Sequence, residues 1–245
     1  MNEAFEKAKQ KIIGTDRKRQ GIGTLSEKTV HAILKLYFAP DEDMHEIPIE
    51  NYVADIYTGS EIIEIQTRQF NKLRDKLQAF LPLYPVTVVY PIPRYKWLIW
   101  MDPETGELTK PRKSPAKGNC YHAFPELYKI KMFLKDPHLH FKFVLMDIEE
   151  YRVLDGWSRD KKKGSHRYDR IPSELAEEVS IDRREDYLQF IPYDLKEPFT
   201  SAEFAKAAHI PRQLSQTVLN ILTEVGCVER TGKQGKSILY RSADW

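Results

Sequence analysis

Two acids and an amide, Asp55, Glu64 and Gln66, stand among apolar and β-branched residues early in the chain. The stretch from Glu61 to Thr67 alternates with a period of two, which predicts a strand with Glu64 and Gln66 on one face. A preceding strand and a Thr-Gly-Ser turn would bring Asp55 opposite them. Two converging carboxylates repel each other, and a hard divalent cation relieves that repulsion most directly. The spacing therefore predicts a metal site on a hairpin.

Helices are expected on both sides of this hairpin. Apolar spacing from Thr24 predicts a helix that ends before Pro40 and carries Glu27 and His31 one turn apart on the same face. Glu27 is a candidate for the site, with exposure to solvent as the alternative, and His31 is expected to pack or to face solvent. Residues 69–81 predict a second helix, stopped by a proline, and residues 86–90 read as a buried strand. A strand, a crossover helix and a strand form a parallel pair.

This order of elements resembles the PD-(D/E)XK phosphodiesterase superfamily, which has the restriction-endonuclease-like fold, over roughly residues 20–150. In that family a helix bearing a Glu precedes a strand with an Asp, and an acidic-x-Lys motif follows on the next strand. The chain has Ala54 in place of the family's Pro, and Gln66 in place of its Lys. The resemblance implies a catalytic set and a set of ligands for Mg²⁺ or Mn²⁺. The catalytic set is Glu27, Asp55, Glu64 and Gln66, and the metal ligands are Asp55, Glu64 and the Ile65 carbonyl.

The composition indicates a globular chain, because 245 residues with 41% hydrophobic content are enough to bury a core. A net charge of +2 is too small to indicate a polyanionic partner, so local groups of cations must carry that argument. Two cysteines make no disulfide framework, and no apolar run approaches the ~20 residues of a membrane helix. We therefore expect a cytoplasmic protein with no membrane partner.

Three basic segments are suited to phosphate contact, with a solvated surface as the alternative for each. They are Arg17 to Arg19, the stretch from Lys110 to Lys117, and the loop 159–170, in which Lys161, Lys162 and Lys163 are the candidate DNA contacts. The second of these segments would be the return leg of a predicted hairpin that starts with a strand at residues 96–101.

A helix is predicted over residues 124–134 and a buried strand over residues 141–148. Two pairs flank these elements, Cys120 with His122 and His138 with His140. Alternate residues of a strand face the same way, so these pairs could make a zinc site, although the spacing matches no zinc module. Polar side chains beside core strands are the favoured interpretation.

From Pro198 onward the pattern of helix, turn, helix and hairpin resembles a winged helix-turn-helix. The second helix would start at Arg212 and end at Gly226, and a glycine turn would join the two strands of the wing. Side chains of the second helix can read base edges, and lysines of the wing can reach phosphates. The candidate DNA contacts are Arg212, Gln213, Gln216, Asn220, Lys233 and Lys236. Winged helices also serve in protein docking and dimerisation, so a homodimer stays open.

The prediction is an α/β protein with a restriction-endonuclease-like mixed central sheet flanked by helices, plus a small C-terminal winged-helix domain. The nuclease-like domain would span residues 1–190, and the winged helix residues 191–245. The expected function is metal-dependent hydrolysis of DNA phosphodiester bonds, with duplex DNA as the partner. The alternative is a DNA-binding or regulatory protein whose nuclease-like domain has lost its chemistry, because the amide of Gln66 cannot supply the charge of a lysine.

Overall fold

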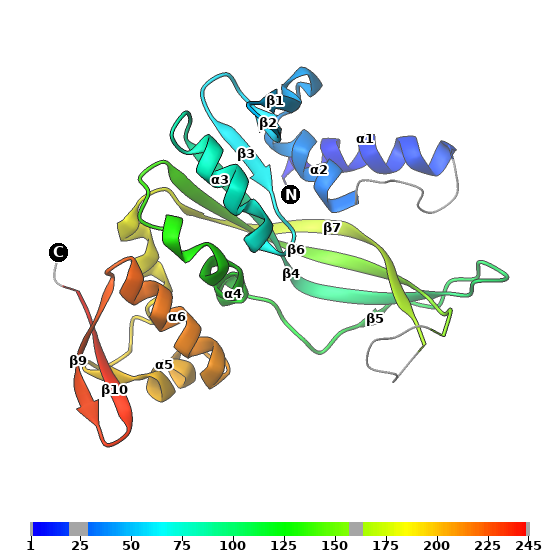
Figure 1. Cartoon of the computed structure of the whole chain (residues 1–245). Helices are drawn as coiled ribbons and strands as arrows, with labels where there is room; N and C mark the ends of the chain where they lie inside the picture. Colours follow the sequence, from blue (N-terminus) through cyan, green and yellow to red (C-terminus); the bar gives the residue numbers. More distant parts are fainter. Residues whose placement is uncertain (1, 20–28, 157–163, 244–245) are drawn as a thin grey trace. The chain divides into compact units, whose positions relative to one another are not determined.

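The chain is mixed α/β, with a large mixed sheet flanked by helices (Figure 1). The computed structural model describes residues 2–19, 29–156 and 164–243, and of residues 15–19 the backbone alone. Within these ranges the sheet has seven strands in the order β1-β2-β3-β4-β6-β7, with β5 paired to β4. The strands are β1 (His45–Ile49), β2 (Tyr52–Tyr57), β3 (Ile62–Ile65), β4 (Val86–Met101), β5 (Arg112–Lys113), β6 (Leu139–Val153) and β7 (His166–Ile181).

The described residues form two compact units, and the long strands β4, β6 and β7 contribute to both. The first unit comprises Met1–Ile47, Pro91–Asn119 and Val144–Glu178. The second comprises Pro48–Tyr90, Cys120–Phe143 and Val179–Trp245. The expected domain boundary near residue 190 stays a prediction.

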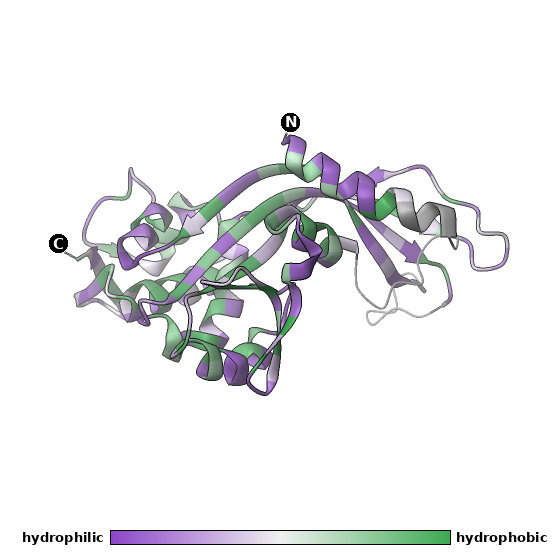
Figure 2. Ribbon diagram, turned by 90° about the horizontal axis from the view of Figure 1, so that it is seen from above, coloured by the Kyte–Doolittle hydropathy of each residue, from purple (hydrophilic) through white to green (hydrophobic). Residues whose placement is uncertain are grey.

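Helices α1 (Glu3–Arg19) and α2 (Thr29–Phe38) pack against each other in the first unit. Helix α1 is largely hydrophilic in Figure 2, and Phe5 is the large side chain that it buries, against the edge of the Tyr37 ring at 5.8 Å. Thr29 and Tyr37 of α2 donate hydroxyl hydrogen bonds to Asp169 and Glu178 of β7. A short 3-10 turn, η1 (Glu42–Met44), then leads into β1. Helix α2 is the helix expected to end before Pro40, and it is confirmed where the structure describes it.

In the second unit, the hairpin β2–β3 is followed by a crossover and by β4, which pairs parallel to β3. The crossover expected as one helix is a 3-10 turn, η2 (Phe70–Leu73), that continues into α3 (Arg74–Phe80). The expected helix at 124–134 is likewise α4 (Phe124–Leu127) continued as a 3-10 segment, η4 (Tyr128–Phe133). The parallel pair and the mixed sheet are therefore confirmed.

Strand β4 is a single strand where two separate strands were expected. Pro91 and Pro93 lie within this strand and have no N–H to donate, and the pairing of β4 with β3 has ended before them, at Val89. Strand β6 is also longer than expected, and β7 was not predicted. The end of the predicted basic loop, from His166 to Arg170, belongs to β7.

The C-terminal elements comprise two helices and a three-stranded antiparallel sheet. They are β8 (Phe199–Thr200), α5 (Ser201–Ala207), α6 (Arg212–Glu224), β9 (Val228–Gln234) and β10 (Ser237–Ser242). Thr200 caps α5 reciprocally with Glu203, as Thr before a helix predicts. Helix α6 also packs against α4, and the Tyr121 ring lies 6.2 Å from that of Phe204. The C-terminal helices thus share a core with earlier elements of the same unit.

In the part of the chain that the structure describes, none of the helices has the length and apolar character needed to span a membrane.

Candidate functional site

The hairpin β2–β3 brings Asp55 and Glu64 together, as the alternation of the sequence predicts. The register pairs Ile56 with Ile63 and Tyr57 with Ile62, and its continuation sets Asp55 opposite Glu64. The turn is closed by the Thr58 N–H, which donates to the Glu61 carbonyl at 3.1 Å. Gly59 has a φ of 92°, in the region that favours glycine.

Hydrogen bonds with the opposite strand hold both carboxylates at this point of the hairpin. The Asp55 N–H donates to Glu64 Oε1 at 3.2 Å, and the Ile65 N–H donates to Asp55 Oδ2 at 2.8 Å. The N–H and the C=O of one strand residue point to the same edge, so the Ile65 carbonyl also points toward β2. Two carboxylates and one carbonyl oxygen therefore lie along a single edge of β3.

Lys76 of α3 is the residue that sequence reasoning missed. Its ammonium donates to Glu64 Oε2 at 2.8 Å and to Oε1 at 3.0 Å. The Glu64 side chain is 2% exposed and that of Lys76 is 25% exposed. A signal was present, because Lys76 follows Leu73 by three residues and precedes Phe80 by four, a spacing that puts it on the buried stripe.

The ionisation of Glu64 is set by competing influences. Burial, and after it the negative charge of Asp55, raise the pKa of Glu64 to about 7, while Lys76 acts to lower it. Lys76 thus opposes the effects of burial and of Asp55, and Glu64 stays close to its titration point at neutral pH.

The Gln66 amide lies at the end of β3 and donates a hydrogen bond to the Arg68 carbonyl. The period of two predicts that Glu64 and Gln66 share one face of the strand. The Gln66 amide, however, is directed toward the loop that follows β3. Glu27, the third expected acid, lies outside the described residues, as do Lys161, Lys162 and Lys163. Helix α2 is described from Thr29, where its side chain contacts Asp169.

The candidate DNA contacts of the C-terminal elements divide into two groups. Five of them are exposed, on the first half of α6 or on the β9–β10 hairpin: Arg212, Gln213, Gln216, Lys233 and Lys236. Asn220 is the exception, because it is half-buried and its Oδ1 accepts a hydrogen bond from Lys131 at 3.2 Å. Lys131 also pairs with Glu224 of α6 at 3.0 Å. The expected exposure of Asn220 is therefore wrong, because that side of α6 packs on η4.

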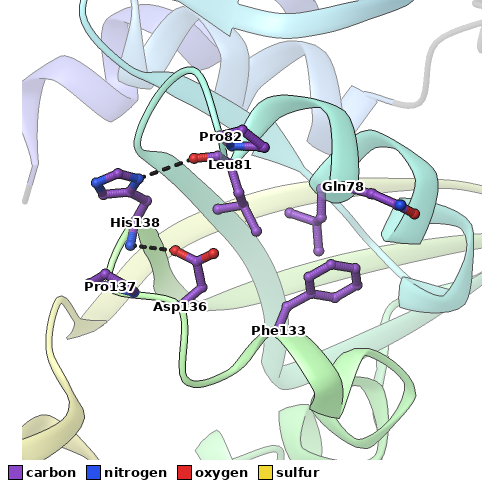
Figure 3. Close-up of a pocket in the computed structure, with 8 residues that line it drawn as sticks. Gln78, Leu81, Pro82, Phe133, Asp136, Pro137 and His138 are labelled. Atoms are coloured by element: carbon purple, nitrogen blue, oxygen red, sulfur yellow. Dashed lines mark hydrogen bonds between the residues drawn. The ribbon is translucent and has the colours of Figure 1, made fainter.

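The Cys and His pairs considered as zinc ligands are not brought together. In the described ranges, no group of three or more His, Cys, Asp or Glu side chains could hold a metal ion. His140 Nδ1 is 2.8 Å from the Asp182 carbonyl. Figure 3 shows His138 beside a pocket of about 420 Å³, with Nδ1 3.1 Å from the Leu81 carbonyl and the backbone N–H bonded to Asp136. These histidines bind main-chain oxygens instead.

Comparison with known proteins gives a family and one relative. The model of a family described as "Domain of unknown function (DUF8091)" matches residues 28–182, a range that includes the hairpin and α3. An "Uncharacterized protein" of Treponema pallidum (strain Nichols) is 27% identical over 221 residues, which cover 90% of this chain and 87% of the relative. No solved structure matches the chain.

Proposed function

The chain belongs to the family described as a domain of unknown function (DUF8091), and from its hairpin site we propose that it is a metal-dependent DNA endonuclease of the PD-(D/E)XK type. One observation carries the proposal. Asp55 and Glu64 meet across the hairpin, and the ammonium of Lys76 lies 2.8 Å from Glu64. Such a set of two acids and a lysine is what the acidic-x-Lys motif provides, here with the lysine on the following helix.

The donor set fits a hard divalent cation such as Mg²⁺ or Mn²⁺. Such ions take carboxylate and carbonyl oxygens, and Asp55, Glu64 and the Ile65 carbonyl would supply them. A carboxylate has about four lone-pair positions, so Glu64 can keep its bonds to Lys76 and still offer an oxygen. A bound ion of this kind lowers the pKa of a water ligand and neutralises charge on the scissile phosphate.

The residues of the chain have separate roles in this scheme. Lys76 favours the ionised form of Glu64. Its ammonium would also supply the positive charge that the Lys of the family's motif supplies and that Gln66 cannot. The Ile65 N–H orients Asp55 through its 2.8 Å bond. Gln66 can orient a water once its amide leaves the Arg68 carbonyl, because an amide both donates and accepts hydrogen bonds. Glu27 keeps the role that the resemblance implies, at an outer-shell water or a second ion.

The fold agrees with this proposal. A helix, an antiparallel hairpin, a crossover helix and a parallel strand follow in the order that the restriction-endonuclease-like fold requires. The two helices and the three-stranded sheet of the C-terminal elements support the proposal of a winged helix, in which α6 would be the recognition helix. Arg212, Gln213 and Gln216 would read bases, and Lys233 and Lys236 would reach phosphates of duplex DNA.

One observation favours a second function, that of a DNA-binding protein without catalysis. The Gln66 amide is satisfied by the Arg68 carbonyl, and Lys76 already provides a counter-charge for Glu64. A hairpin stabilised in this way can persist without a metal. The two functions predict opposite results when the protein is mixed with DNA and a divalent ion.

Cleavage of supercoiled plasmid and linear duplex, with Mg²⁺, Mn²⁺ or EDTA, tests the proposal. We expect cleavage with either ion and none with EDTA. Glu64→Gln and Lys76→Met should each lower the rate at least about a hundredfold, as losses of key electrostatic groups do. Lys72→Met, an exposed lysine of η2 in the same crossover, is the matched control and should retain the rate. Absence of cleavage with both ions, or wild-type cleavage by folded Glu64→Gln, would overturn the proposal.

A further inference from the structure

The segment from Leu108 to Gly118 lies along the second half of β4, at an edge of the sheet (Figure 1). Its N–H groups donate to β4 carbonyls at three places, from Thr109 to Trp100, from Ser114 to Lys96 and from Gly118 to Arg94, at 2.7–2.9 Å. A Cβ on Gly118 would lie 2.0 Å from the Pro93 oxygen, so only glycine permits this approach. The segment is thus fixed to the sheet, although its outer side is exposed.

Among the residues that the structure describes, the cations of this segment have no acidic partners. Lys110, Arg112, Lys113 and Lys117 are its charged residues, and it contains no Asp or Glu. Within the described ranges no ion pair joins any of these four to a carboxylate. Arg94 of β4 is different, because it forms a two-point pair with Asp147 at 2.8 Å. The positive charge that the segment adds to this edge is therefore uncompensated.

Two aromatic rings of β4 lie beneath these cations. Lys113 Nζ is 3.8 Å from the centre of the Tyr95 ring and 5.5 Å from that of Trp97, and Lys117 Nζ is 5.6 Å from Tyr95. The pairing of Trp97 with Lys113 puts the two on the same face of the sheet. Cation–π attraction holds the lysine stems over the rings, and both rings stay half-exposed. We call Tyr95, Trp97, Lys110, Arg112, Lys113 and Lys117 the Tyr95–Lys113 edge.

We propose that the Tyr95–Lys113 edge binds a single strand of nucleic acid. Unpaired cations along an extended segment follow a phosphate backbone, and aromatic rings between them accept unpaired bases by stacking. A duplex hides its bases from such rings, so the rings favour an unstacked strand. The argument uses none of the residues of the hairpin site, and it goes beyond the proposed cleavage of duplex DNA. It holds whether or not Asp55 and Glu64 support chemistry.

Binding of a fluorescent dT20 oligonucleotide to the full chain, at several salt concentrations, tests this inference. Lys113→Ala with Lys117→Ala should weaken binding at least tenfold at low salt and lower the log-log salt slope by about 1.4, or about 0.7 per phosphate contact. The matched control is Lys7→Ala with Lys196→Ala, which removes two exposed lysines elsewhere and should change neither quantity.

The rings are tested by Tyr95→Ser and Tyr95→Phe in the same assay. Tyr95→Ser should weaken dT20 binding at least fivefold with an unchanged salt slope, because it removes stacking area and no charge, and Tyr95→Phe should keep the affinity. Equal losses in the lysine variant and its control would overturn the inference. So would a loss confined to duplex DNA, or one seen only on vesicles that contain phosphatidylserine, since each result assigns the edge to another ligand.

Discussion

Replacement of Lys76 by methionine should destabilise the protein more at alkaline pH than at acid pH. Met keeps most of the side-chain volume and removes the charge that lies 2.8 Å from Glu64 Oε2. Unit charges at that distance attract by about 6 kcal/mol at an effective dielectric constant near 20. Desolvation of the pair and the partial exposure of Lys76 offset part of this. We therefore expect the free energy of unfolding to fall by about 3 kcal/mol at pH 8.

The pH dependence follows from the pKa of Glu64, which burial and Asp55 raise from 4.5 to about 7. A carboxyl with a raised pKa in the folded state has its full stability below the unfolded value, and loses it as the pH rises through the folded value. In Lys76→Met the pKa rises further, so Glu64 stays protonated to higher pH. With a wild-type pKa of about 7, the cost of the substitution should be about 1.4 kcal/mol smaller at pH 5 than at pH 8.

Urea unfolding of four proteins at pH 5 and pH 8 measures these quantities. The set is the wild type, Lys76→Met, Glu64→Gln and the double variant, which together form a double-mutant cycle. Glu64→Gln should recover most of the stability that Lys76→Met loses at pH 8, because it removes the unpaired charge. Equal losses at both pH values, or a coupling energy near zero, would refute the buried ion pair as the source of the effect.

Three further predictions concern other residues. Burial alone would raise the pKa of Glu150, but the charges around it, that of Arg170 first, lower it, so its contribution is present above pH 4.5 and is lost as the pH falls. Glu150→Gln should therefore cost about 2–3 kcal/mol at pH 7 and flatten acid unfolding, as measured by circular dichroism. Gln66→Ala should lower DNA cleavage while fluorescence anisotropy gives an unchanged duplex affinity, and wild-type cleavage would remove Gln66 from the mechanism. Lys233→Ala with Lys236→Ala should lower the salt slope of duplex binding by about two, and an unaltered slope would assign the hairpin another role.

The pattern of the sequence predicted the structural features that depend on residues close together in the chain. The alternation around Glu64 and the turn at Gly59 fixed the hairpin, because the strand period decides the face of each side chain. The spacing of Lys76 put it on the buried stripe of its helix, but its partner Glu64 depends on how α3 packs against the hairpin, which the local pattern does not contain. Asn220 was misplaced for a similar reason, since only the packing of α6 on η4 decides which side of that helix is covered.

The balance of charge separates the hairpin site from the other buried acids of the sheet. Asp147 pairs with Arg94, and Glu150 pairs with Arg152 and Arg170 at 2.9 and 3.0 Å. Arginines match these acids, and the pKa of Glu150 is lowered, as expected of an ion pair that serves stability. Glu64 pairs with Lys76 and lies beside Asp55, and its pKa is raised, with burial as the first cause. A raised pKa of this kind is more typical of a functional site than of a structural ion pair, and it supports our proposal that Asp55 and Glu64 bind a divalent ion.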